Sequence, residues 1–342
     1  MHDVDLVYVV TRAHAFRTYL IPFSIIKRDL INVKSLEEFV SFLHMTYYRD
    51  PLTAISEINL ENVVGVFKKC FVDRFKRFIN MTPSKYLDLI DAYTYSFDVD
   101  SVLQVVAEKI SGVRHRSPEY YAPPFSKIDI ERFISMEDIE QCIELLKETP
   151  FCLEKDVIDM WKKYRAIYII EMALRRQIYV RYVAALEKVS DEDRKGLLEI
   201  IGTEIDMANI SIVIGPMLYG YSPSIAWRML IPFEYRVNLN ALKKAYGLES
   251  DIILKLVPDI YRGIVEYYLA GLDMKAKSLA RRMILRKILS VLPRYPINYT
   301  YVFGIIKLLE YEYKNLKMIA EALDYGISPR EIKDLLILDE PL

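Results

Sequence analysis

Residue types that could carry chemistry are sparse in this 342-residue chain, and none of them forms a recognisable motif. The histidines and cysteines are His2, His14, His44, His115, Cys70, Cys142 and Cys152. They do not occur at zinc-ligand spacing, and no local motif pairs a nucleophile with a base. The phosphate-binding patterns GxxxxGK followed by Ser or Thr, and GxGxxG, are both absent from the sequence. We therefore predict no catalytic residue, no cofactor and no metal site.

Acidic residues at helical spacing raise one enzymatic alternative, because all-α enzymes such as isoprenoid synthases hold magnesium with Asp-rich helical motifs. Here Asp88 with Asp91 and Asp156 with Asp159 form isolated pairs, whereas such a site needs adjacent acidic residues. An all-α enzyme is accordingly the least favoured function for this chain.

A pattern of one acid, one small polar residue and one glycine occurs three times along the chain. Ser or Asn follows the acid by three positions, and Gly follows it by fourteen. The three sets are Asp98, Ser101 and Gly112; Asp206, Asn209 and Gly220; and Glu312, Asn315 and Gly326. The acids lie 108 and 106 positions apart, so three units of this length nearly exhaust the chain. We predict helical repeats over residues 1–122, 123–235 and 236–342.

An acid and an Asn three positions later share one face of a helix. Both lie among aliphatic residues, so we expect this face to be partly buried, and a buried carboxylate needs donors that the Asn amide could supply. The pattern therefore predicts a polar clamp between helices. The alternative is a partner contact made once per repeat. Ser101 replaces Asn in the first repeat and predicts a weaker clamp there.

The helices that position these residues can be placed from their start and stop signals. Sixteen positions before each acid lies Thr82 (followed by Pro), Ser190 or Pro296, and each of these can begin a helix that runs about 25 residues toward its Gly. A second long helix precedes each start, over 60–80, 154–188 and 274–292. We predict an all-α protein of three antiparallel helical hairpins, with pseudo-threefold related domains.

Shorter helices are predicted wherever a capping residue precedes an apolar run. Ser35, Ser135, Ser222 (with Pro223) and Ser328 each begin such a segment.

The charge distribution excludes some partners and leaves others open. The formal net charge is −1, without the basic excess of a nucleic-acid-binding domain. The first helix of each hairpin is rich in Lys and Arg, which predicts either solvated, internally paired faces or contact with an acidic partner or anionic lipid heads. The N-terminal MHDVDLVYVV lacks a positive region and predicts no secretory signal.

The uncharged stretch from Met207 to Trp227 is long enough to span a bilayer. Because it contains Gly215, Pro216 and Gly220, we interpret it as a buried helix that stops, followed by a turn and a second start.

Two short motifs lie close together in the C-terminal region, the run from Glu310 through Asn315 to Ile319 and the run Gly326-Ile327-x-Pro329. With these motifs the chain resembles the C/d subunit family of archaeal/vacuolar-type rotary ATPases. Further matching residues are Tyr8, Arg12, Leu43-x-x-Thr46-Tyr47-Tyr48, Leu146-x-x-Thr149-Pro150-Phe151 and Glu204-x-Asp206-x-x-Asn209. Ser101, and the GPMLYGYSP stretch without its usual basic residue, depart from the family pattern.

Membership of this family implies a funnel of three similar helical domains that performs no chemistry. Such an adapter joins the central shaft, made of D- and F-type subunits, to the proteolipid ring, with one copy per complex. It would lie peripherally on the cytoplasmic face of the cell membrane and couple rotation to proton or sodium transport. The main alternative is a generic helical-repeat scaffold that binds other proteins.

Overall fold

The computed structural model describes residues 2–112, 123, 125–292 and 297–339. Every regular element in these ranges is a helix, so the protein is all-α, as predicted. Contacts divide the chain into two compact units. Unit 1 comprises residues 1–84, 190–200 and 272–342, and unit 2 comprises 85–189 and 201–271. The predicted three-domain boundaries stay a prediction.

The helices of unit 1 are α1 (His2–Arg17), α2 (Phe23–Arg28), α3 (Leu36–Leu43), α4 (Arg49–Thr53), α5 (Leu60–Met81), the first part of α12 (Asp191–Leu218), α17 (Asp273–Val291) and α18 (Tyr299–Asp324). Those of unit 2 are α6 (Leu87–Ser111), α8 (Ile130–Ser135), α9 (Ile139–Leu145), α10 (Lys155–Tyr164), α11 (Ile167–Leu186), the rest of α12, α13 (Pro223–Met229), α14 (Leu239–Ala245), α15 (Ser250–Leu256) and α16 (Arg262–Leu269).

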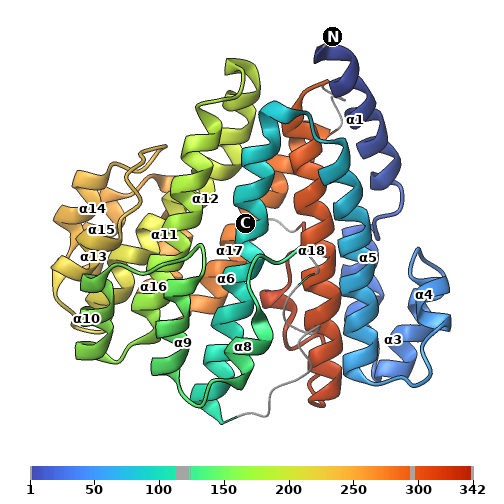
Figure 1. Cartoon of the computed structure of the whole chain (residues 1–342), viewed down its shortest axis with the longest axis horizontal. Coiled ribbons are helices and arrows are strands. Elements are labelled where there is room, and N and C mark those ends of the chain that lie inside the picture. The colour runs from blue at the N-terminus through green and yellow to red at the C-terminus, as the bar shows by residue number, and fades with distance from the viewer. Residues whose placement is uncertain (1, 113–122, 124, 293–296, 340–342) are drawn as a thin grey trace. The chain divides into compact units, whose positions relative to one another are not determined.

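Helix α18 forms the centre of unit 1. It packs side by side with α5 and also contacts α1, α3 and α17 (Figure 1). The segment from Tyr299 to Glu312 is apolar on nearly every side and is buried throughout, as expected of a helix with neighbours all round. Gly304 allows α17 to approach closely, because a Cβ there would lie 3.1 Å from Ile288.

Helices α6 and α11 form the main contact within unit 2. The continuous helix predicted over 154–188 is wrong, because the chain breaks between α10 and α11. Arg165 has a left-handed backbone, with φ of 53°, and its N–H bonds to the carbonyl of Trp161, which ends α10. Nothing in the amino-acid pattern marks this break, since a non-glycine residue rarely adopts that conformation. The other two predicted helices, now α5 and α17, agree with prediction within one residue at each end.

The predicted glycine stops are confirmed at the ends of the three long helices. Gly112, Gly220 and Gly326 follow α6, α12 and α18 with φ of 67° to 69°. At Gly220 and Gly326, the glycine N–H donates to the carbonyl three residues earlier. The N–H of the next residue donates to the carbonyl five residues before it, which completes a Schellman motif. Helix α12 continues through Pro216 and ends at Leu218, two residues before Gly220.

The predicted starts of the three long helices agree less closely. Helix α12 begins directly after Ser190, as predicted. Helix α6 begins at Leu87, five residues beyond Thr82, because the 3-10 turn η2 (Ser84–Tyr86) intervenes. Asn298 caps α18 two residues beyond Pro296, which lies outside the described residues.

The shorter predicted helix starts divide into two that are confirmed and two that are wrong. Ser35 and Ser222 cap α3 and α13. Ser135 instead ends α8, and Asp138 three residues later caps α9. Ser328 begins a turn and not an α-helix, and only the 3-10 turn η6 (Lys333–Leu335) follows. None of the described helices is both long and apolar enough to cross a membrane.

Candidate functional site

The three repeated acids are buried at the middle of long helices. Asp98 of α6, Asp206 of α12 and Glu312 of α18 have at most 1% of their surface exposed. Burial of a carboxylate is unfavourable unless donors surround it. The bonding partners of each acid therefore define what the repeated pattern does.

Asp206 holds an extended segment of unit 2. Its Oδ2 accepts the N–H of Arg236 at 2.9 Å and the hydroxyl of Tyr261 at 2.9 Å, and its Oδ1 accepts the N–H of Val237 at 3.3 Å. Burial raises the pKa of both Asp206 and Tyr261, and the carboxylate raises that of Tyr261 further. The tyrosine therefore stays protonated and donates its hydrogen to the acid.

Glu312 makes the same kind of contacts in unit 1, with an added cation. Its Oε2 accepts the N–H of Ile21 at 2.5 Å, and its Oε1 accepts the hydroxyl of Tyr48 at 2.6 Å. Arg74 of α5 forms an ion pair with Oε1 at 3.0 Å and donates to the Tyr48 oxygen at 2.8 Å. Burial alone would lower the pKa of Arg74, but Tyr48 and Glu312 raise it overall, so the guanidinium stays charged.

Asp98 is the least satisfied of the three acids. Its Oδ2 accepts the N–H of Lys127 at 3.2 Å, whereas its buried Oδ1 has no hydrogen-bond partner among the described residues. Burial raises the pKa of this carboxyl, although the Ser126 side chain and the Lys127 N–H oppose the shift.

One segment serves each acid, and the three segments share a layout. Lys127, Val237 and Ile21 donate backbone N–H groups, and an aromatic residue follows after 24, 24 and 27 positions respectively. These aromatics are Phe151, Tyr261 and Tyr48. Phe151, at the corresponding position of the first segment, has no hydroxyl and cannot donate a hydrogen bond as Tyr261 and Tyr48 do. For Glu312 the segment comes from the N-terminal part of the chain, so the third set of contacts closes back on the first residues.

Two of these aromatic residues, Tyr48 and Phe151, directly follow matching turns. Thr46 and Thr149 donate their hydroxyls to the carbonyls three residues earlier, at 2.6 and 2.8 Å. The same oxygens accept the N–H groups of Tyr48 and Phe151. The Thr-x-aromatic elements seen in the sequence thus hold the backbone at Phe151 and at Tyr48, whose hydroxyl donates to Glu312.

The expected clamp between each acid and its Asn is wrong. Asn315 pairs in both directions with the backbone of Ile337, each bond being 2.8 Å, and Asn209 pairs likewise with Ile231 at 2.9 and 3.2 Å. Both partners lie 22 positions after the Asn. Asp206 and Asn209 instead bind separate points of one segment that follows α12. Glu312 and Asn315 bind two different segments. Such two-way pairing is impossible in the first repeat, because position 123 is Pro and lacks an N–H. Ser101 there donates to the carbonyl of Phe97 in its own helix.

All six polar side chains of the repeated pattern are buried, with exposed fractions from 0 to 3%. Most of these side chains form hydrogen bonds that hold backbone segments against the long helices. We call these three places the polar junctions. No cluster of three or more potential metal ligands occurs in the described part of the chain.

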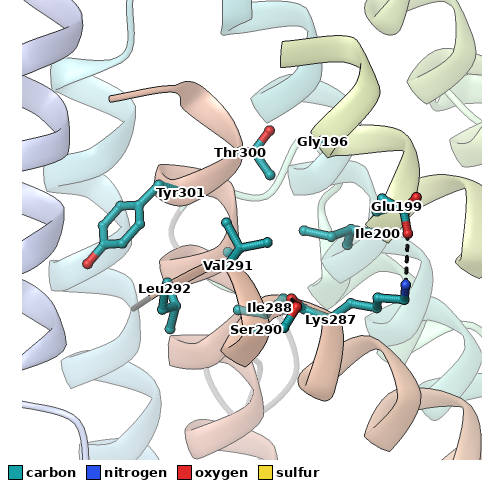
Figure 2. Close-up of a pocket in the computed structure, with 11 residues that line it drawn as sticks. Gly196, Glu199, Ile200, Lys287, Ile288, Ser290, Val291, Leu292, Thr300 and Tyr301 are labelled. Carbon is teal, nitrogen blue, oxygen red and sulfur yellow. Dashed lines mark hydrogen bonds and ion pairs between the residues drawn. The ribbon is translucent and has the colours of Figure 1, made fainter. Parts of the chain in front are cut away.

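A pocket in unit 1 is the other candidate site (Figure 2). It has a volume of about 220 Å³ and is bordered largely by apolar groups, among them Ile200 and Val291. The charged groups at its edge are already paired, because Lys287 contacts Glu199 at 3.0 Å, as Figure 2 shows. The pocket therefore presents no unpaired charge to a ligand, and we assign it no chemistry.

Sequence reasoning missed Tyr48, Tyr261 and Arg74 as partners of the acids. The Thr-x-aromatic spacing singled out Tyr48 but gave no partner for it. Arg74 was one of many basic residues on its helix, and no local signal separates a buried Arg from a solvated one. Its contact with Glu312 spans 238 positions in the sequence.

The described residues define an all-α protein in which buried polar groups tie extended segments to long helices. The chain belongs to the ATP synthase (C/AC39) subunit family, whose sequence profile matches residues 9–335. The resemblance seen in the sequence is thereby confirmed.

Several relatives of the chain carry the name of the C subunit of A-type ATP synthase. The protein of Pyrococcus abyssi is 24% identical over 328 residues, which cover 90% of this chain and 84% of the relative. That of Methanosphaera stadtmanae is 20% identical over 332 residues, covering 90% and 82%. That of Methanocaldococcus jannaschii is 22% identical over 328 residues, covering 90% and 80%.

Proposed function

We propose that this chain is the non-catalytic central-stalk adapter of an A/V-type ATPase or ATP synthase. It couples rotation of the D- and F-type shaft subunits to the membrane proteolipid ring during proton or sodium transport. One copy per complex lies peripherally on the cytoplasmic face of the cell membrane. The observation that carries this proposal is the family match over residues 9–335, together with relatives named as subunits of A-type ATP synthase.

The polar junctions support a mechanical role. An adapter must pass torque without yielding, and buried hydrogen-bonded networks such as those around Asp206 and Glu312 make a core more rigid and specific. The junction of Glu312 links α18 to α5 and to the segment beginning at Ile21, so one carboxylate joins three parts of unit 1.

The recurrence of the junctions also supports a threefold repeat. We infer three domains, over 1–122, 123–235 and 236–342, related by approximate threefold pseudosymmetry. The third is completed by the segment from Ile21 to Tyr48, which serves Glu312 as the segment from Arg236 to Tyr261 serves Asp206. The three domains can be superposed in an experimental structure of the complex. If Asp98, Asp206 and Glu312 then lie on non-equivalent elements, the inference is contradicted.

The function is tested by reconstituting the rotary complex in vesicles with and without this chain. Ion uptake and phosphate release are measured on the same vesicles. We expect ATP hydrolysis to persist without the chain while ATP-driven ion uptake stops, because torque no longer reaches the ring. Adding back the purified chain should restore uptake. Ion pumping that continues without the chain would refute the adapter role, and binding to unrelated proteins alone would favour the generic scaffold.

A further inference from the structure

A groove in unit 1 lies between the segment around η1 (Leu30–Asn32) and the turn that follows α18. It has a volume of about 600 Å³, within the range of ligand-binding clefts. Ile31, Val33, Leu323 and Ile327 supply its apolar lining. The first two are buried and Ile327 is 41% exposed, so the groove has an apolar floor with an accessible apolar edge.

Two cations, Lys34 and Arg330, line the same groove, and no acidic side chain does. Both side chains are exposed, and neither forms an ion pair within the described part of the chain. The Nε of Arg330 donates to Oδ1 of Asn32 at 2.7 Å, which fixes the guanidinium at the groove. An apolar floor beside two uncompensated positive charges is complementary to a ligand that carries both apolar groups and carboxylates.

Two acids close in sequence to these cations, Glu38 and Glu331, accept backbone N–H groups. Oε2 of Glu38 accepts the N–H of Lys34 at 2.8 Å, and Oε1 of Glu331 accepts the N–H of Ser328 at 3.2 Å. These bonds shape the two turns that border the groove. Neither carboxylate forms an ion pair with Lys34 or Arg330 in the described part of the chain, so both cationic side chains can still contact a ligand.

The turn after α18 borders the groove and has a fixed backbone. Gly326 has φ of 69°, and a Cβ at this position would meet no atom within 4 Å. The N–H of Ile327 bonds to the carbonyl of Ala322 at 2.8 Å and holds the following residues in a fixed turn. The apolar edge of the groove is thus preorganised, which lowers the entropy lost on binding.

We propose that this groove binds an acidic peptide segment of a partner protein, whose apolar side chains enter the floor and whose carboxylates contact Lys34 and Arg330. Tyr and Trp are the residues enriched where a protein meets a lipid interface, and none of the lining residues is aromatic. The concave shape and apolar floor therefore favour a peptide over a lipid surface.

The test uses the full chain with Lys34→Glu and Arg330→Glu combined. The matched control is Arg49→Glu with Lys195→Glu, two exposed basic residues of unit 1 outside the groove. Dissociation constants are measured against purified shaft subunits, purified proteolipid ring in detergent, and protein-free anionic vesicles. We expect the groove variant to bind one protein probe at least about tenfold more weakly and the control to stay within about twofold.

A photocrosslinker in place of Ile327 then identifies the occupant in the complex that the groove variant weakens. A crosslinked peptide containing Asp or Glu beside apolar residues supports the proposal, as does rescue of the groove variant by changing that acid to Lys. Crosslinking to lipid alone, or affinities for both protein probes that match the control, would overturn it. The choice of probes rests on the proposed function. Binding of the wild-type chain to neither probe overturns both proposals, whereas an unaffected groove variant overturns only this one.

Discussion

Replacing Asn315 with Leu keeps the side-chain size and removes both bonds to Ile337. Because Ile337 is 1% exposed, its N–H and carbonyl would lose their partners with little access to water. An unsatisfied buried polar group costs about 1–3 kcal/mol, so we expect the free energy of unfolding to fall by about 2–5 kcal/mol. Asn209→Leu removes equivalent bonds to Ile231 and should have a similar effect on unit 2.

The two units can be followed separately during urea unfolding. Both tryptophans of the chain, Trp161 and Trp227, belong to unit 2, so their fluorescence follows that unit, while far-ultraviolet circular dichroism follows all helices. Asn209→Leu should shift the fluorescence transition, and Asn315→Leu should shift a transition seen by circular dichroism.

The matched control is Asn80→Leu, the same substitution at an exposed position of α5. It should change stability by no more than about 0.5 kcal/mol. An unfolding free energy for Asn315→Leu that equals the control value would show that the Asn–backbone pairing contributes nothing, and would refute this account of the polar junction.

Three further sets of variants test the junctions and the helix ends by urea unfolding. Glu312→Gln leaves Arg74 buried without a counter-charge and should cost about 3–5 kcal/mol, whereas Arg74→Met combined with Glu312→Leu should cost less than the sum of the single changes; additivity would contradict a coupled pair. Burial raises the pKa of Asp98 above 3.8, so the folded chain binds more protons than the unfolded one between the two values, and wild-type stability falls as pH rises through that window. Asp98→Asn removes this loss, so its stability relative to wild type should increase from pH 4 to 7; a pH-independent difference would argue against the raised pKa. Gly326→Ala forces a left-handed Ala and should cost about 1–2 kcal/mol, while Gly65→Ala, within exposed helix, should stabilise by about 0.5–1 kcal/mol; equal effects would contradict the backbone argument.

The sequence by itself determined the helical class, most long helices and the family. These depend on local signals, since apolar spacing, capping residues and glycine stops act within a few positions of the chain. Gly112, Gly220 and Gly326 show this most clearly, because a left-handed residue after a helix is a local requirement. Burial of the repeated acids and Asn residues was likewise predictable from their aliphatic neighbours.

Only the tertiary structure decided which groups meet those buried side chains. Glu312 contacts Ile21 and Tyr48 from 291 and 264 positions away, and periodicity within one helix carries no information about such partners. The predicted direct pairing of acid and Asn was wrong for the same reason. The Asn amide instead pairs with the buried N–H and carbonyl of another segment, because buried backbone groups need hydrogen-bond partners. The groove beside Lys34 and Arg330 likewise forms only where residues 31–34 meet residues 323–330. Short-range sequence patterns thus specify the helices, while the fold selects which buried polar groups complete each other.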